Sequence, residues 1–435
     1  NNNNNNNRSS GFYYTDGLAA QQPFPNNVRI KFSAAPIKKL KKRYTLSKNF
    51  FVILLALIVI FLIEKRSVVG NMFFNGNSWH KPEIPWKGPR EFEIDPEEFN
   101  NFEMIVSGHA AQGNLLVTRS SNDTSLINIK TEILLSNESL QNRVEIVSFY
   151  DSSNYILHIK TPEFCVFPDC ILTNIVITFP KNLTNFGNFI INVINLNINN
   201  DDLKEITFDN INWKLSPSIN VKGLKSREIS VHSSGQISGN YYIDDFLLLQ
   251  TSNSQINANT KSFSNSTPKS IKLFSSNSAI QGSFPSAHLF EAHTSNGRID
   301  LNIKNASQDN QQNDDKIILD TSNGYISGVY DVNSEWHAST TNGNINVKLN
   351  LANLTDLVRI SGITSNGKIG TLISDSYKGQ FHLQTSNGKI TIEGNNDDIN
   401  YDVNAKSLKT GYKGRNYNNE LSLNSSNGKI DLKFF

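Results

Sequence analysis

The sequence predicts an all-β protein whose C-terminal half is a parallel β-helix, or β-solenoid, of about ten short rungs. Three observations lead to this prediction. A Thr-Ser-Asn-Gly-x-Ile motif recurs through residues 225–435. Apolar residues alternate along the segments on either side of it, and most intervals between its copies lie between 18 and 27 residues. Such a repeat is typical of a stack in which each rung buries its apolar face against its neighbours.

One Thr or Ser in each copy, called the slot residue below, aligns the repeats. The slot residues are Ser233, Thr251, Ser275, Thr294, Thr321, Thr340, Thr364, Thr385 and Ser425. The last interval is 40 residues, which we interpret as two rungs of 20, with Ala405 in the slot of a unit that has lost the motif. Ten units result.

The segments around each slot residue read as strands. Apolar residues stand two and four positions before it, as Leu249 and Leu247 do before Thr251, and this alternation indicates a strand with one buried face. An isoleucine follows the slot by five positions, as Ile256 does. A second short strand is therefore expected after a tight corner.

An asparagine marks that corner, two positions after the slot, in eight of the ten units. These structural corner residues are Asn253, Asn277, Asn296, Asn323, Asn342, Asn366, Asn387 and Asn427. Glycine follows in only six, because Ser254 and Ser278 replace it. Asparagine tolerates left-handed backbone angles and can hydrogen-bond its own turn. Stacked amides can also form a ladder along the axis.

An antiparallel array of hairpins or a sandwich is the alternative, since Asn-Gly between alternating runs also signals a hairpin. The repeat length, with insertions confined to certain intervals, favours the solenoid. Residues 99–224 are strand-rich but lack the motif. They are expected to form irregular rungs or an N-terminal cap before the repeats of 225–435.

The first 98 residues differ in composition from the body. Residues 1–43 are Asn-rich and then basic, and we expect a disordered arm. Residues 44–66 contain an unbroken apolar run, 50–63, and are expected to form a single transmembrane signal anchor in the lipid bilayer; a buried core helix is the alternative. Residues 67–98 carry four prolines, which suits an extended stalk.

Charge sets the expected orientation. Of 41 Lys and Arg and 39 Asp and Glu, residues 1–66 hold 11 and 2, which leaves 30 and 37 for the rest. The basic run 38–43 places the N-terminus in the cytoplasm, so the body is expected to be extracellular or lumenal, as in a single-pass type II membrane protein. The acidic body lacks a basic patch for phosphates, which argues against nucleic-acid binding.

An oxidising compartment would favour a disulfide between Cys165 and Cys170, the only two cysteines. It would also allow N-glycosylation of sequons in polar segments. The expected glycosylation sites are Asn265, Asn305, Asn353, Asn122, Asn137 and Asn182. The first three lie in the longest intervals between slots, which read as surface loops, whereas Asn424 lies in a strand beside its slot.

The repeated Thr/Ser-Ser-Asn-Gly-x-Ile units of residues 225–435 resemble those of the putative-adhesin family of bacterial and fungal proteins. The resemblance implies a β-helical fold, a cell-surface or envelope role and no enzyme activity. The unit at Ala405 and the short first unit at Ser233 depart from the family pattern. They are expected to be an irregular rung and a capping rung.

The function expected from these features is that of a non-catalytic surface protein, adhesin-like, structural or binding, without cofactor or metal site. Partners would be glycans or surface proteins, with a homotypic contact at the C-terminal rung. The alternative is a β-helix hydrolase or lyase acting on polysaccharides, which needs carboxylates converging from adjacent rungs. The acids Asp300, Asp320 and Asp431 show no shared slot, and no zinc-binding or nucleophile-elbow motif is present.

Overall fold

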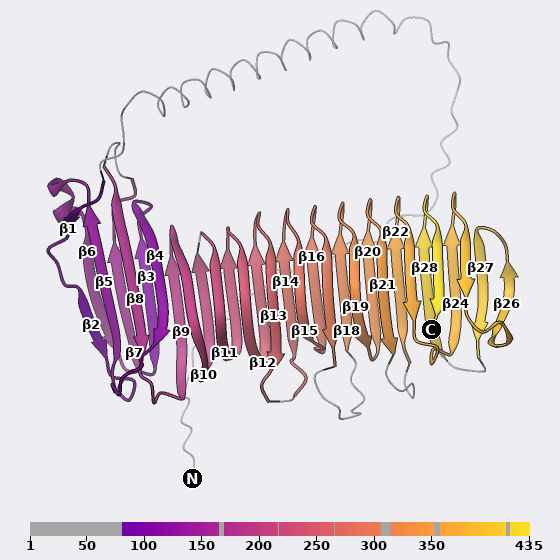
Figure 1. Ribbon diagram of the computed structural model, residues 1–435, viewed down its shortest axis with the longest axis horizontal. Helices are drawn as coiled ribbons and strands as arrows, with labels where there is room; N and C mark the ends of the chain where they lie inside the picture. Colours follow the sequence, from indigo (N-terminus) through magenta and orange to yellow (C-terminus); the bar gives the residue numbers. More distant parts are fainter. Residues whose placement is uncertain are drawn as a thin grey trace, which may run out of the picture. The chain divides into compact units, whose positions relative to one another are not determined.

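The computed structural model describes residues 81–435, with gaps at 165–168, 216, 265, 306–314, 352–356 and 415–417. The expected arm, the anchor at 44–66 and the first part of the stalk lie outside the described residues. Within the described part of the chain, no helix is long and apolar enough to cross a bilayer. What is described is an all-β unit with a long sheet of parallel strands, consistent with a β-helix (Figure 1).

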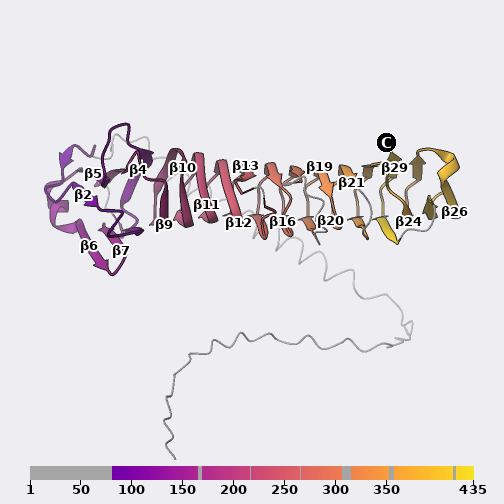
Figure 2. The same ribbon diagram turned by 90° about the horizontal axis from the view of Figure 1, so that it is seen from below.

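Three long strands, β10 (Leu196–Leu215), β11 (Ile219–Ser233) and β12 (Ile237–Thr251), bend across the unit and join two rows of strands (Figure 2). Row A contains their C-terminal halves and row B their N-terminal halves. The strand after each corner belongs to row B and the strand before it to row A. Each rung therefore contributes one strand to each row.

Row A has a continuous hydrogen-bonded order. From one edge it runs β6 (Glu145–Asp151), β7 (Asn154–Lys160), β3 (Asn101–Ser107), β9 (Asn185–Val193), β10, β11, β12, β14 (Ser270–Ser275), β16 (Leu289–Thr294), β18 (Lys316–Thr321), β20 (Glu335–Thr340), β22 (Arg359–Thr364), β28 (Asn419–Ser425), β24 (Gly379–Thr385), β27 (Leu408–Lys413) and β26 (Ile399–Asn404). Pairing is parallel from β7 to β24 and antiparallel only at the two ends.

Row B faces row A across the core. It runs β1 (Ile84–Pro85) and β2 (Glu91–Ile94), both on β5 (Ile127–Leu135), then β8 (Ile171–Phe179), β4 (Ala111–Arg119), β10, β11, β12, β13 (Ile256–Ser262), β15 (Ile280–Pro285), β17 (Ile299–Lys304), β19 (Ile326–Val332), β21 (Ile345–Leu351), β23 (Ile369–Ile373), β29 (Ile430–Phe434) and β25 (Ile390–Glu393). Two short 3-10 helices, Glu138–Arg143 and Asn396–Asp398, lie in connections.

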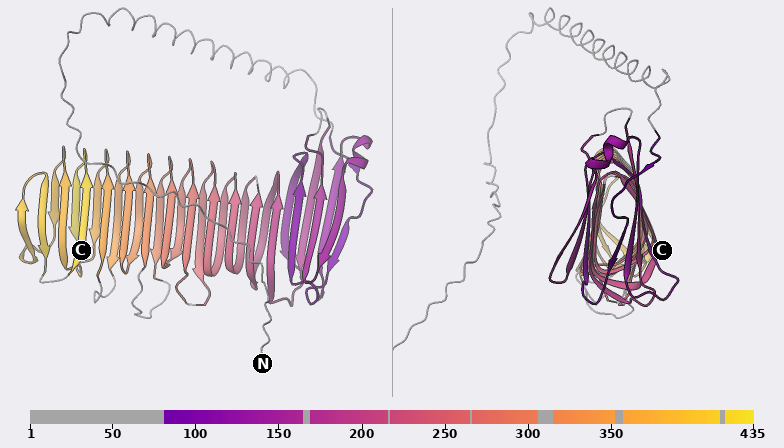
Figure 3. Two further views of the ribbon diagram at one scale, coloured as in Figure 1. Left: turned by 180° about the vertical axis from the view of Figure 1, so that it is seen from behind. Right: turned by 90° about the vertical axis from the view of Figure 1, so that its left-hand side faces the viewer.

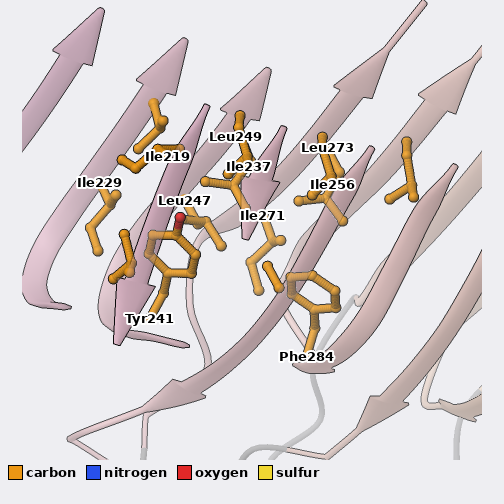
Figure 4. Packing of buried hydrophobic residues seen from close by; sticks show 14 of the residues in the cluster. Ile219, Ile229, Ile237, Tyr241, Leu247, Leu249, Ile256, Ile271, Leu273 and Phe284 are labelled. Atoms are coloured by element: carbon orange, nitrogen blue, oxygen red, sulfur yellow. The ribbon is translucent and has the colours of Figure 1, made fainter. Parts of the chain in front are cut away.

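The core lies between the rows, as the end-on view of Figure 3 indicates. Equivalent residues of successive rungs pair in register, so that Ile237, Ile256 and Ile280 form one buried column. Leu247 and Leu249 pack from the opposite row (Figure 4). The apolar alternation seen in the sequence therefore marks the inward face of each strand.

Residues 99–224 continue both rows instead of forming a separate domain. Strand β9 pairs in parallel with β10 in row A, and β4 pairs in parallel with β10 in row B. Part of the expected stalk also belongs to this unit, because β1 and β2 pair with β5 and Trp86 is buried. Burying that indole favours packing over an extended linker for residues 84–94.

The expected unit around Ala405 is wrong. Ala405 lies at the turn between β26 and β27, where its N–H donates to the carbonyl of Leu408, and these two strands form an antiparallel hairpin beside β24. The interval of 40 residues therefore contains a hairpin and not a rung. Without a slot hydroxyl or a corner amide, residues 399–413 lack the groups that bond adjacent rungs together.

The C-terminal rung is not at the end of the stack either. Strand β28 lies between β22 and β24, and β29 lies between β23 and β25. Both edges of this rung are already paired, and Leu432 and Phe434 are buried. The expected homotypic contact at this rung stays a prediction, and it would require one of these paired edges to open.

Candidate functional site

The corner of each rung is held by the slot hydroxyl. Thr321 Oγ1 accepts a hydrogen bond from Gly324 N at 3.1 Å and donates one to the carbonyl oxygen of Gly297, in the preceding rung, at 3.0 Å. Thr340 and Thr364 repeat both contacts. A Cβ at Gly324 would overlap the Gly297 carbonyl, so glycine at this position allows the corners of adjacent rungs to stack closely.

The corner asparagines form a ladder. Asn323 Nδ2 donates to Asn296 Oδ1 at 2.7 Å, and Asn342 Nδ2 donates to Asn323 Oδ1 at 2.7 Å. The series runs Asn253, Asn277, Asn296, Asn323, Asn342, Asn366, Asn427 and Asn387. Left-handed backbone is not the reason for asparagine here, because among the described non-glycine residues only Ser152 and Asn195 have positive φ.

A row of hydroxyls lies between the slots and the ladder, one position after each slot. Its members are Ser252, Ser276, Ser295, Ser322, Thr341, Ser365, Ser426 and Ser386. Ser365 is half-buried and the others are exposed, and within the described residues none of these hydroxyls has a hydrogen-bond partner. The regular row therefore presents hydroxyls without a protein partner to solvent at each rung, about 4.8 Å apart.

A groove of about 440 Å³ follows this row on the outside of row A. One wall consists of five hydroxyl residues, Ser252, Ser276, Ser295, Ser322 and Thr341. The other wall consists of the outward residues directly before the slots, Gln250, Phe274, His293, Asp320 and Ser339. It crosses five rungs, or about 19 Å at the usual strand spacing. This length suits an extended ligand with repeated polar groups.

Asp320 supplies the charge in the groove. His293 Nδ1 lies 3.1 Å from its carboxylate, and Ser339 Oγ donates to it at 2.6 Å. The hydrogen bond from His293 is the main cause of a lowered pKa of Asp320, and that from Ser339 lowers it further. The carboxylate is thus held ionised, and it can accept hydrogen bonds from a ligand that carries hydroxyl or ammonium groups.

The aromatic rings of the groove are packed on each other. Phe274 and His293, on neighbouring strands, stack with ring centroids 5.3 Å apart and planes 8° apart. Two rings stacked along the axis present their edges outward, so they shape the wall and orient His293 towards Asp320. Polar contacts would have to supply most of the recognition.

The residues of this groove do not form a catalytic triad. Ser339 donates to Asp320 and not to His293, whereas a nucleophilic serine must give its proton to the imidazole. Asp300 and Asp431 share one row-B position, contrary to the expectation from sequence, but β19, β21 and β23 separate them. That is about 19 Å, beyond the carboxylate spacing of glycosidases.

A second hollow of about 390 Å³ lies between β24, β28 and the β26–β27 hairpin, and it does contain two acids, Asp402 and Glu420. Both are exposed, and Glu420 lies 3.6 Å from Arg359. These exposed positions differ from the apolar environment that keeps the general acid of a glycosidase protonated.

Within the described residues, no group of three or more His, Cys, Asp or Glu side chains is placed to hold a metal.

The expected disulfide and glycosylation sites are only partly described. Cys165, Asn265 and Asn353 lie outside the described residues, so the bridge to Cys170 stays a prediction. Asn122, Asn182 and Asn305 are exposed, and Asn137 is half-buried as the N-cap of the first 3-10 helix. Sequence reasoning missed the hydroxyl row, although the Ser or Thr after each slot is visible in the repeat.

Comparisons with known proteins give only remote structural matches. No protein-family model matches the chain, and no curated protein matches it. A putative cell adhesion protein from Clostridium sporogenes ATCC 15579 is 11% identical, covering 80% of this chain and all of that one, with a TM-score of 0.16. A putative adhesin from Parabacteroides merdae ATCC 43184 is 12% identical, covering 65% and 95%, with a TM-score of 0.24. Likeness at these TM-scores assigns no function to this chain.

Proposed function

We propose that this protein is a membrane-anchored, outward-facing and non-catalytic surface module that binds extended glycans along the row-A groove, in an adhesin-like role. The observation that carries the proposal is the groove itself, in which five partnerless hydroxyls face an ionised Asp320 across five rungs. Sugars offer hydroxyls at regular intervals, and an array of donors and acceptors with a carboxylate can bind them. Residues 44–66 would provide the anchor.

The test uses the full chain displayed on cells, with an array of immobilised polysaccharides as the probe. Ser322→Arg places a long cationic side chain in the groove next to Asp320 and should abolish retention on any glycan that the wild type binds. Ser386→Arg is the matched control, because Ser386 has the same corner position in a rung outside the groove. Equal binding by the two variants, or no glycan bound by the wild type, would refute the proposal.

The second hollow is the observation that supports one other candidate function, that of a hydrolase or lyase acting on polysaccharides. Its two acids would be Asp402 and Glu420. Incubation of the purified full chain with cell-wall polysaccharides, followed by reducing-end analysis, would detect product. If Glu420→Gln abolished product release while Ser322→Arg left it unchanged, the enzyme interpretation would replace the binding one.

A further inference from the structure

The C-terminal rung, residues 419–435, occupies a place that its position in the sequence does not predict. The rungs β22–β23 and β24–β25 follow each other along the chain, yet the described pairings place the C-terminal rung between them in both rows. The segment between β23 and β24 must therefore cross two strand spacings, about 10 Å, instead of one. Both walls of the gap, residues 359–373 and 379–393, precede its occupant in the chain.

The gap binds its occupant through side chains as well as backbone. Asn427 takes its turn in the ladder, donating to Asn366 at 2.7 Å and accepting from Asn387 at 2.7 Å. Asn419 is buried, and it accepts from Val358 N at 2.8 Å while its amide donates to the carbonyl of Lys378 at 2.7 Å. The occupant thus bonds to the rungs on both sides.

Burial of apolar side chains also stabilises the C-terminal rung in the gap. The side chains of Leu421, Leu423, Ile430, Leu432 and Phe434 are all buried. Burying such side chains contributes roughly 1.5–3 kcal/mol each. An unfilled gap would expose two parallel edges and the apolar faces of both neighbouring rungs, which is a strong template for strand addition.

We propose that this gap is an interaction site for the C-terminal rung of a second copy, so that neighbouring molecules exchange residues 419–435. The second copy carries the same side chains in the same order, and it therefore satisfies every contact that the chain's own rung makes. Exchange of an identical element is a low-cost route to association, because each bond lost within one chain is regained between chains.

Local concentration decides which occupant is bound. The chain's own rung is tethered nearby and has an effective concentration in the millimolar range. Exchange is therefore expected mainly where copies are crowded during folding. It would link copies side by side without using the row-A groove, so it is independent of glycan binding.

The experiment traps an exchanged rung between two differently tagged full-length chains that are co-expressed. One chain carries Ser361→Cys in β22 and the other carries Ser422→Cys in β28, which are register partners. Partner residues on adjacent strands are close enough for a disulfide. Both chains also carry Cys165→Ser and Cys170→Ser. We expect a disulfide-linked heterodimer on a non-reducing gel.

The matched control replaces Ser361→Cys by His337→Cys, because His337 is the register partner of Ser361 on β20, one strand further from β28. This pair should give no heterodimer. A single chain with both Ser361→Cys and Ser422→Cys shows that the geometry allows the bond. The pair Ile363→Cys and Asn424→Cys, also register partners, repeats the test. Closure within single chains without any heterodimer from either pair would overturn the proposal.

Discussion

At the scale of the residue, the slot hydroxyl connects one rung to the next. Thr321 Oγ1 satisfies both the N–H of Gly324 and the carbonyl of Gly297, and the side chain is buried. A methyl group in place of this hydroxyl would keep the volume but leave both backbone groups without a partner. Only Thr and Ser combine the required size with a group that both donates and accepts.

Thr321→Val is therefore expected to destabilise the protein by about 1–3 kcal/mol, the cost of an unsatisfied buried polar group. Thr321→Ser keeps the hydroxyl and loses a methyl, at about 1 kcal/mol. Urea unfolding of the two variants measures the difference. A valine variant as stable as the serine variant would contradict the role given to the hydroxyl.

The stability of the folded protein at acid pH should depend on the contacts of Asp320. Its carboxyl pKa is lowered from the ordinary 3.8, first by the hydrogen bond from His293. A depressed folded-state pKa adds stability above the unfolded pKa, and this stability is lost as the pH falls through the folded value. The urea midpoint of the wild type should thus fall more steeply below about pH 4 than that of Asp320→Asn. Parallel curves would contradict this.

At this scale the sequence located the right positions for partly wrong reasons. The repeat identified the slot residues and the eight corner asparagines, because both recur at fixed offsets. Left-handed backbone, one of the reasons offered for asparagine, is wrong, because these residues do not have positive φ. The predicted contact between the amides of stacked rungs is confirmed. That contact joins residues 19–61 positions apart, and only the stacking order brings them together.

At the scale of the element, the β26–β27 hairpin closes one end of row A. Lys413 in β27 is buried, and its Nζ lies 3.0 Å from the Asp375 carboxylate and donates to the Asp375 carbonyl at 2.6 Å. Its Nζ also lies 5.2 Å from the centre of the Phe434 ring. The hairpin is thus fixed both to the segment before β24 and to the C-terminal rung.

Lys413→Met should loosen this hairpin while the stack stays folded. Methionine fills a similar volume but removes the bonds to Asp375. Because Asp375 is exposed and its acceptors can bond to water instead, we expect a cost of about 0.5–1.5 kcal/mol, the net contribution of a hydrogen bond. Hydrogen exchange in β26 and β27 should accelerate, while that in β16–β19 stays as in the wild type.

Lys406→Met is the matched control, because Lys406 lies at the turn of the same hairpin with an exposed side chain. It should leave the exchange of the hairpin unchanged. Equal acceleration by both substitutions would show that the buried ammonium is not what holds the hairpin.

The individual strands followed from the sequence because inward and outward residues alternate. The hairpin did not, since Tyr401 and Val403 also alternate as a rung strand would, yet both are exposed. Alternation identifies a strand and leaves its partner and direction open. The available signals that this segment was no rung were the absence of a hydroxyl at Ala405 and Ser407 in place of the corner asparagine.

At the scale of the whole described unit, parallel stacking makes rungs interchangeable. Removing residues 322–340, one full interval of 19 residues, joins Thr321 to Thr341 and brings β18 against β22 with every slot in register. We expect a folded protein, shorter by one rung, with strand content close to that of the wild type by circular dichroism and a lower urea midpoint.

A deletion of residues 322–330, about half an interval, is the control for length. It removes a corner and most of β19, so the slot column and the row-B column cannot both stay in register. This variant should fail to fold. If both deletions were tolerated alike, the described register would not be what stabilises the unit.

The sequence indicated the parallel stack but not the order of its last rungs. Every rung offers the same hydroxyl, amide and apolar column to both sides, so adjacency in the chain was the natural expectation. The inserted rung shows that these shared contacts do not require the rungs to stack in the order of the chain. Buried partners specific to one place, such as Asn419 with Val358 and Lys378, select the order found.

Because of the inserted rung, the gap can be filled only at the end of synthesis. Strand β25 ends at Glu393 and β29 ends at Phe434, so 41 further residues must be made before the gap can be filled. At about 5–20 residues per second, this takes roughly 2–8 s. During that interval the nascent chain carries two open strand edges, which a chaperone could recognise as the mark of an unfinished molecule.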